Sequence, residues 1–127
     1  MANDYPDYLS PAGRNIEGGS MTSYIFDIEV ASDDYGIVML PAVPAGCENI
    51  YQCLTISCLD DSAIHWVMLI RWSDGWDFFV VSFVTGGIFD FPGQAIAAGE
   101  QVALIVTNDS AGTLGFSGAV NYVTRAV

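Results

Sequence analysis

The sequence contains no lysine, only three arginines and a single histidine, against 15 aspartates and glutamates. Its formal net charge is −12 at pH 7. Such a surface repels DNA, RNA and anionic membranes, because all of these are polyanions. We therefore expect neither a nucleic acid nor a membrane among the partners of this chain.

The missing lysine also bears on the environment of the protein. At ordinary salt, so many like charges oppose a compact state. At molar salt the Debye length falls to about 3 Å and this repulsion largely vanishes. The composition is typical of a protein adapted to a salt-saturated cytoplasm, and the alternative is an ordinary acidic protein from a mesophile.

The sequence also has little from which a catalytic or metal site could be built. Its one histidine, His65, falls within an apolar alternation, where a histidine is far more often structural than catalytic. There is no glycine-rich phosphate loop and no metal-type spacing of His and Cys. The carboxylate pairs Asp33-Asp34, Asp60-Asp61, and Asp74 near Asp77 either bind Ca²⁺ or are solvated surface. We expect no enzymatic activity, no cofactor and no metal.

The cysteines, Cys47, Cys53 and Cys58, form an odd set without a CxxC spacing. On one strand, Cys47 and Cys53 would lie about 20 Å apart at about 3.3 Å per residue, which is beyond the reach of a disulfide. Three free, mostly buried thiols fit assembly in a reducing cytoplasm. No apolar run reaches the length of a transmembrane helix.

What the sequence does have is a pair of apolar runs around Ser73-Asp74-Gly75, spanning residues 63–85. A three-residue loop that ends in glycine predicts a bulged β-hairpin. In the register that fits best, Arg71 faces Asp77 and Leu69 faces Phe79.

Both faces of this hairpin are apolar. One carries Ile64, Trp66, Met68, Ile70, Trp72, Trp76, Phe78, Val80 and Val84, and the other carries His65, Val67, Leu69, Phe79, Val81 and Phe83. A second sheet covers only one of these faces. Leaving the other exposed to water would lose roughly 10 kcal/mol of stabilisation, at about 1.5–3 kcal/mol per buried side chain. We therefore predict an oligomer contact between identical subunits, formed by Val67, Leu69, Phe79, Val81 and Phe83.

Alternation and turn signals predict seven or eight strands at spacings of about 8–12 residues. The predicted strands cover residues 22–31, 36–40, 48–59, 63–72, 76–84, 88–91, 101–107 and 114–123. This pattern is the signature of an all-β protein, an antiparallel β-sandwich or jelly roll. We expect 63–72 and 76–84 to be central neighbours and 22–31 to lie near an edge.

Two regions follow from this reading, an extended N-terminal arm over residues 1–20 and a single sandwich domain over 21–127. The prolines and glycines of the arm leave no periodicity from which a core element could form. Its apolar side chains are Tyr5, Tyr8 and Leu9. The arm folds back on its own domain or lies on a partner, and we favour a partner contact through these three residues.

Three tryptophans, Trp66, Trp72 and Trp76, share one face in the predicted register. An exposed aromatic row would suit stacking on sugars, whereas Trp alternating with Ile, Met and Phe suits a core or a subunit interface. Because Trp72 and Trp76 border the turn, we expect these two to reach the surface.

Two segments carry a resemblance that extends over the whole chain. They are Leu40-Pro-Ala-Val-Pro-Ala-Gly46 before a strand, and residues 98–112 before a glycine-rich final strand ending Val-Asn-Tyr-Val-Thr-Arg125. With the layout of arm and sandwich, the chain resembles the small jelly-roll structural proteins of tailed viruses, such as capsid decoration, turret and fibre-base proteins. The acidic, lysine-free composition points to a virus of a halophilic archaeon or bacterium.

The resemblance implies a virion protein without catalysis, assembled in the host cytoplasm. It implies a homo-oligomer, with a trimer favoured, that binds the major capsid protein or another virion protein. The alternative is a carbohydrate-binding sandwich in a turret, fibre or spike that touches the host surface, favoured by the three tryptophans and the carboxylate-rich loops.

Overall fold

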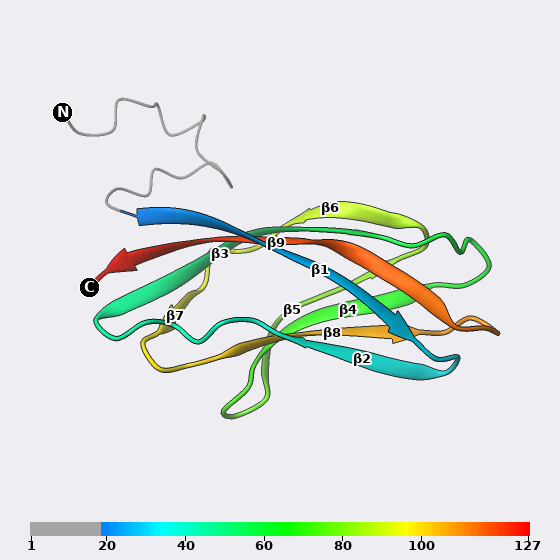
Figure 1. Ribbon diagram of the computed structural model, residues 1–127, viewed down its shortest axis with the longest axis horizontal. Coiled ribbons are helices and arrows are strands. Elements are labelled where there is room, and N and C mark those ends of the chain that lie inside the picture. Colours follow the sequence, from blue (N-terminus) through cyan, green and yellow to red (C-terminus); the bar gives the residue numbers. More distant parts are fainter. Residues whose placement is uncertain (1–18) are drawn as a thin grey trace.

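The computed structural model describes residues 19–127, which form two antiparallel β-sheets arranged as a sandwich (Figure 1). The strands are β1 (Gly19–Val30), β2 (Asp34–Met39), β3 (Cys47–Ser57), β4 (His65–Arg71), β5 (Trp76–Phe83), β6 (Gly86–Asp90), β7 (Ala95–Ala97), β8 (Val102–Asn108) and β9 (Leu114–Ala126). The predicted all-β antiparallel sandwich is confirmed. Within residues 19–127, no helix is long and apolar enough to cross a membrane.

The order of the strands is that of a jelly roll. One sheet has the order β1-β9-β3-β6, with β7 also paired to β3, and the other has the order β2-β8-β4-β5. The chain crosses between the sheets at most connections, and β4 and β5 are joined as a hairpin within one sheet. We call the sheet that contains β1 the first sheet and the sheet that contains β2 the second.

The strands predicted from the sequence are present, with ends shifted by a few residues, and the short β7 is an addition. Strand β1 lies at an edge as predicted, but β5 also lies at an edge, so only β4 of the hairpin is central. Gly19 and Ser20, assigned to the arm, begin β1. The remaining arm residues, including Tyr5, Tyr8 and Leu9, lie outside the described residues.

The register of the hairpin matches the prediction from Leu69 away from the turn and departs from it between Leu69 and the turn. Leu69 faces Phe79 as predicted, but a bulge follows, so Ile70 faces Asp77 and Arg71 faces Trp76. A bulge places two residues opposite one and turns the following side chains to the other face of the sheet. The predicted pairing of Arg71 with Asp77 is therefore wrong.

A second bulge lies in β3. Tyr51 faces Tyr122 and Cys53 faces Asn121, so Gln52 is the extra residue. The bulge turns Tyr51 to the same side as Leu54, although strict alternation would place the two on opposite faces. Tyr51 is fully buried as a result.

The core lies between the two sheets and corrects one prediction. Val67 and Leu69 are 0% exposed and Phe83 is 5% exposed, while Phe79 and Val81 are half-buried and pack against the same cluster. The five side chains predicted to form an oligomer contact therefore belong to the core of their own sandwich, and that prediction is wrong. Their partners are the inward residues of the first sheet, among them Phe26, Leu54, Phe116, Val120 and Tyr122.

Candidate interaction surface

The outward side of the second sheet is covered almost entirely by apolar side chains. We call it the apolar face. It comprises Tyr35, Ile37 and Met39 from β2, Ala103, Ile105 and Thr107 from β8, Trp66, Met68 and Ile70 from β4, and Val80 and Ser82 from β5. Ile64 and Val84, which flank the hairpin, are also exposed.

The strand register arranges these side chains in rows across the sheet. The central row is Ile37, Ile105, Met68 and Val80, each directly opposite the next. Trp66 stands beside this row and, like Val80, is 45% exposed. Four strands about 4.8 Å apart and five residues of about 3.3 Å each give a surface of roughly 19 by 17 Å. A patch of roughly 300 Å² is comparable with the largest exposed apolar patch of a typical monomer, which is often functional.

Asp77 is the one charged side chain paired onto this side of the second sheet, and carboxylates stand at both ends of the apolar face. Asp77 faces Ile70 at the end nearest the hairpin turn. At the opposite end, Thr107 donates a hydrogen bond to Asp109 over 3.4 Å. A partner for this face must therefore be recognised mainly by apolar contact and shape.

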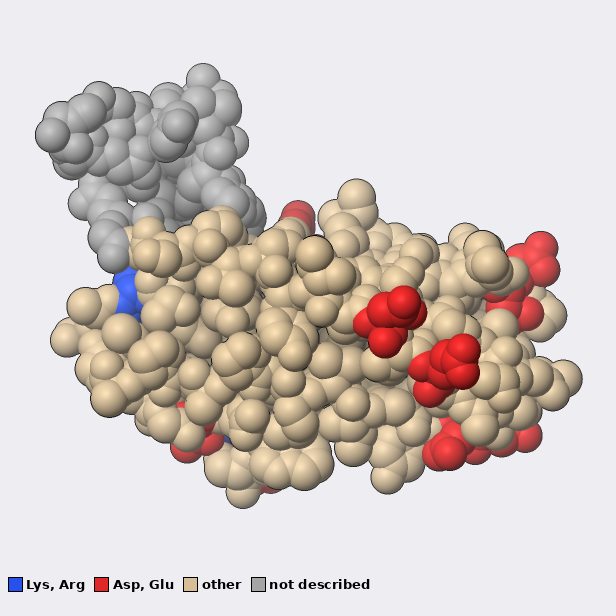
Figure 2. All heavy atoms as spheres, viewed as in Figure 1, with Lys and Arg blue, Asp and Glu red and all other residues tan. Residues whose placement is uncertain are grey.

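Charge is distributed unevenly over the rest of the molecule. In Figure 2, most of the acidic side chains in view lie over the right half, toward the end where the loop from β1 to β2 and the loop from β8 to β9 lie in Figure 1. Both arginines among the described residues are neutralised, Arg71 by Asp74 and Arg125 by Glu48. Over residues 19–127 the surface thus offers no unpaired arginine to an anionic ligand.

The hairpin turn presents the two tryptophans expected at the surface. Trp72 is 49% exposed and Trp76 is 38% exposed. The Arg71 guanidinium lies 4.9 Å from the centre of the Trp76 ring and donates to Asp74 through Nε over 3.0 Å. The hydrogen bond from Arg71 is the main reason that the pKa of Asp74 falls to about 2. Because the bulge turns Trp76 away from the side that holds Trp66, the three tryptophans do not form one row.

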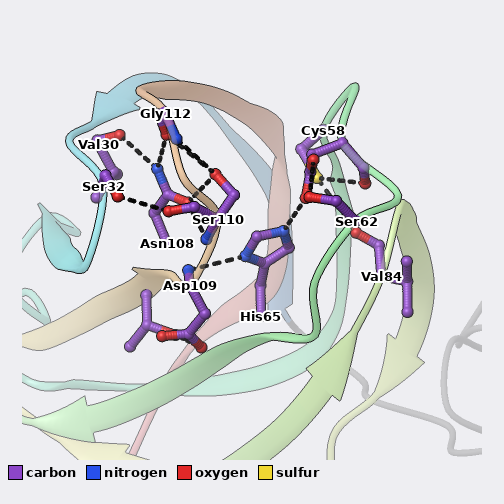
Figure 3. Close-up of polar contacts among 12 residues, drawn as sticks. Val30, Ser32, Cys58, Ser62, His65, Val84, Asn108, Asp109, Ser110 and Gly112 are labelled. Carbon is purple, nitrogen blue, oxygen red and sulfur yellow. Dashed lines mark hydrogen bonds and ion pairs between the residues drawn. The ribbon is translucent and has the colours of Figure 1, made fainter.

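His65 lies in a hydrogen-bonded network at the other end of β4 (Figure 3). It is 0% exposed and packs between the rings of Phe83 and Phe116. The amide N–H of Asp109 donates to His65 Nδ1 over 3.2 Å, so Nδ1 acts as an acceptor, and Nε2 lies 3.1 Å from Asp60 Oδ2. The Ser62 hydroxyl donates to Asp60 rather than to His65. This geometry ties two loops to the sheet and gives no nucleophile access to the ring.

Asn108 ties the loop from β8 to β9 to the end of β1 (Figure 3). Its side-chain amide donates to the carbonyls of Val30 and Gly112, both over 2.8 Å, and its Oδ1 accepts from the amide and hydroxyl of Ser110. Asn108-Asp109-Ser110 matches the N-glycosylation pattern, but the Asn108 side chain is fully buried and its hydrogen bonds are already made. Asn108 therefore has a structural role, since it holds the loop against the end of β1.

Tyr51 is a buried ionisable group whose pKa is changed by its surroundings. Its ring centre lies 5.1 Å from that of Tyr122, and its hydroxyl accepts a hydrogen bond from Asn49 over 3.4 Å. Burial raises the pKa of Tyr51 to about 12. The phenolate is thus disfavoured in the folded chain.

This shift predicts alkaline unfolding. The folded pKa lies above the unfolded value of 10.0, so the stabilisation is complete below pH 10 and is lost as the pH rises toward 12. A shift of that size corresponds to roughly 2–3 kcal/mol. Urea unfolding between pH 9 and pH 12 measures it, and Tyr51→Phe should flatten the curve while Tyr35→Phe, an exposed tyrosine, should leave it unchanged. An equally steep curve for Tyr51→Phe would assign the effect to another group.

The structure places the exposed apolar side of the hairpin opposite to the side that the sequence predicted. The hairpin was recognised as apolar on both sides, but the inward and outward sides were exchanged, and the contributions of β2 and β8 were not anticipated. Within residues 19–127, no three His, Cys, Asp or Glu side chains are grouped so that they could hold a metal ion. All three cysteines are free thiols, with Cys58 buried and the other two half-buried.

No protein-family model and no curated protein matches this sequence. Among solved structures, the fold is similar to that of PirA, with a TM-score of 0.54 and 13% sequence identity over 78% of this chain and 94% of that chain. This likeness shows the fold alone.

Two further solved structures are more distant. One is a protein of Bacillus endospore appendages, described as disulfide-linked pili, with a TM-score of 0.43 and 13% identity over 82% of this chain and 88% of that chain. The other is the virus-like particle of the extra small virus of the giant freshwater prawn Macrobrachium rosenbergii, with a TM-score of 0.31 and 13% identity over 90% of this chain and 84% of that chain.

Proposed function

We propose that this chain is a non-enzymatic structural protein of a virion, a capsid decoration protein that binds the capsid lattice as a homo-oligomer. The apolar face is its subunit contact. The single observation that carries the proposal is a face that is uncharged except for Asp77 at one end, on a chain of net charge −12, built from side chains of all four strands of the second sheet. A trimer remains the favoured oligomer.

The physical argument combines the hydrophobic effect with charge. Burying large apolar side chains is worth about 1.5–3 kcal/mol each, and obligate interfaces between subunits are more apolar than other contacts. Two copies of this chain repel one another over most of their surfaces. They meet least repulsion where the carboxylates lie at the ends of the contact, as Asp77 and Asp109 do on the apolar face.

In this proposal the N-terminal arm attaches the oligomer to the capsid through Tyr5, Tyr8 and Leu9. Deleting residues 1–18 should leave a folded oligomer of unchanged subunit number and abolish its attachment to capsid shells. Co-sedimentation with shells of the major capsid protein measures the binding, and light scattering measures the oligomer. A matched control replaces Tyr5, Tyr8 and Leu9 by serine at full length. Truncated protein that still saturates the shells would remove the arm from the proposal.

The halophilic setting gives a salt prediction. Lowering KCl from molar concentration to about 0.1 M lengthens the Debye length from about 3 to about 10 Å and restores repulsion among the carboxylates. The melting temperature should fall with the salt concentration. A melting temperature that stays flat over this range would favour the ordinary acidic protein.

A second candidate function, carbohydrate binding, is favoured by one observation. Trp72 and Trp76 stand exposed at the hairpin turn beside Asp74 and Asp77, where stacking and hydrogen bonding to a sugar could combine. A glycan array in molar KCl with the full chain and with Trp72→Ala and Trp76→Ala tests it. Glycan binding that both substitutions abolish, in a protein that does not add to shells, would select this function over the first.

A further inference from the structure

The four sheet edges of the described chain differ in how they are protected from pairing with another strand. Strand β2 is short, with six residues, β5 carries the bulge, and Pro92-Gly93 separates β6 from β7. Short strands, bulges and prolines are the usual means by which proteins block an edge. The fourth edge, β1, has none of them.

Strand β1 is 12 residues long and pairs with β9 without any shift of register. It contains no proline, and its first eight residues, Gly19 to Phe26, carry no charge. Two large apolar side chains of this stretch point outward from the first sheet, Met21 at 51% and Ile25 at 78% exposed. A long, regular, uncharged edge that carries exposed apolar residues is an open site for strand addition.

We propose that β1 pairs with β1 of a second copy, antiparallel and centred on Ser23, so that the first sheets of the two copies become continuous. A two-fold axis perpendicular to the sheet passes midway between the two facing Ser23 residues and keeps the outward side chains of both copies on one side. In this register Met21 of each copy faces Ile25 of the other. The two apolar side chains that the single chain leaves exposed thus cover each other.

Charge favours a second copy as the occupant of this edge. With the axis at Ser23, Asp27 of each copy faces Gly19 of the other. The two Asp27 carboxylates then lie eight residues apart, about 26 Å at about 3.3 Å per residue, well beyond the Debye length of about 10 Å at 0.1 M salt. The pairing therefore joins two acidic chains through a segment whose only carboxylates, Asp27 of each copy, lie at its two ends.

This contact is separate from the apolar face, since it involves the first sheet and an edge rather than the second sheet and its outer surface. It would join one oligomer to the next. Its failure would leave the proposed function standing, and the failure of the proposed function would leave this contact testable.

Disulfide trapping tests the register. In the full-length chain, Ser23→Cys places two thiols directly opposite each other, at a Cα separation of about 4.5–5.5 Å that a disulfide can span. Asp27→Cys is the matched control, because its two copies lie about 26 Å apart in the same register. Mild oxidation in molar KCl should give a covalent dimer with a 23–23 disulfide for the first variant and none for the second. No such disulfide, or equal yields from both variants, would overturn the proposal.

The mass of a second set of variants tests the contact without a covalent bond. Trp66→Glu, which disrupts the apolar face, should leave a dimer joined through β1. Adding Met21→Glu and Ile25→Glu should give a monomer, whereas adding Ile88→Glu should not, because Ile88 is as exposed as Ile25, at 77%, and lies on the opposite edge of the first sheet. A monomeric Trp66→Glu protein, or a dimer that survives the two β1 glutamates, would overturn the β1 contact. A Trp66→Glu protein with the mass of the wild type would instead count against the apolar face.

Discussion

Replacing Leu69 by aspartate is expected to prevent folding rather than to dissociate an oligomer. Leu69 is 0% exposed and faces Leu104 and Phe79 across the strands on either side. The substitution removes a buried apolar side chain, worth about 2–5 kcal/mol, and leaves a carboxylate without a partner in the core. The loss is comparable with the whole stability of a typical domain, about 5–15 kcal/mol.

Far-ultraviolet circular dichroism and urea unfolding in molar KCl measure this effect. The matched control is Val80→Asp, which adds the same charge at a position that is 45% exposed on the next strand. The control should remain folded. A Leu69→Asp chain that folds normally and only loses subunits would place Leu69 in an intersubunit contact and reverse the assignment of the two faces.

Replacing Trp66 by glutamate is expected to have the opposite effect, a folded chain that no longer associates through the second sheet. The Trp66 side chain makes no hydrogen bond to the described part of the chain, and its backbone N–H bond to Thr107 is unaffected by the substitution. Losing the burial of a large aromatic costs about 1.5–3 kcal/mol per contact, which is about 10- to 100-fold in the dissociation constant. An added charge on an apolar interface increases the loss.

Light scattering over a range of protein concentrations measures this association, and Ile88→Glu is the control with the same change of charge on the first sheet. The control should keep the subunit contact through the apolar face. Equal masses for Trp66→Glu and Ile88→Glu at every concentration would remove Trp66 from the contact.

The strands could be predicted from the sequence because their signals are local. Alternating residues such as Tyr24, Phe26 and Ile28 in β1 define a half-buried strand, and Gly75 with its φ of 72° ends the turn as its position in the sequence indicates. Short β7 was missed because three residues are too few to show alternation. The pairing of Leu69 with Phe79 followed from the turn and from the apolar match across the hairpin.

Which side of the hairpin faces inward could not be predicted, because both sides are apolar. The choice depends on where the first sheet lies, and that is set by crossings between strands far apart in the sequence. Bulges are a second reason. One extra residue at Gln52 and one at Phe78 reverse the alternation for the residues beyond them, and neither residue type marks a bulge.

The apolar face was missed for the same reasons. It is assembled from four strands, and only two of them, β4 and β5, are neighbours in the sequence. Ile37 and Ile105 become part of one row with Met68 only after β2 and β8 pair. The excess of apolar side chains could be seen in the sequence, but the strand register that brings them together on one face could not be predicted from it.

The most direct test of the account is hydroxyl-radical footprinting of the wild-type protein at high and low concentration in molar KCl. Trp66 and Met68 are both readily oxidised side chains on the apolar face, so the method reports on the surface itself. If this face is the subunit contact, both residues should be protected at high concentration and become reactive on dilution, in step with the loss of mass seen by light scattering. Equal reactivity of both residues in the oligomer and the dissociated chain would contradict the account.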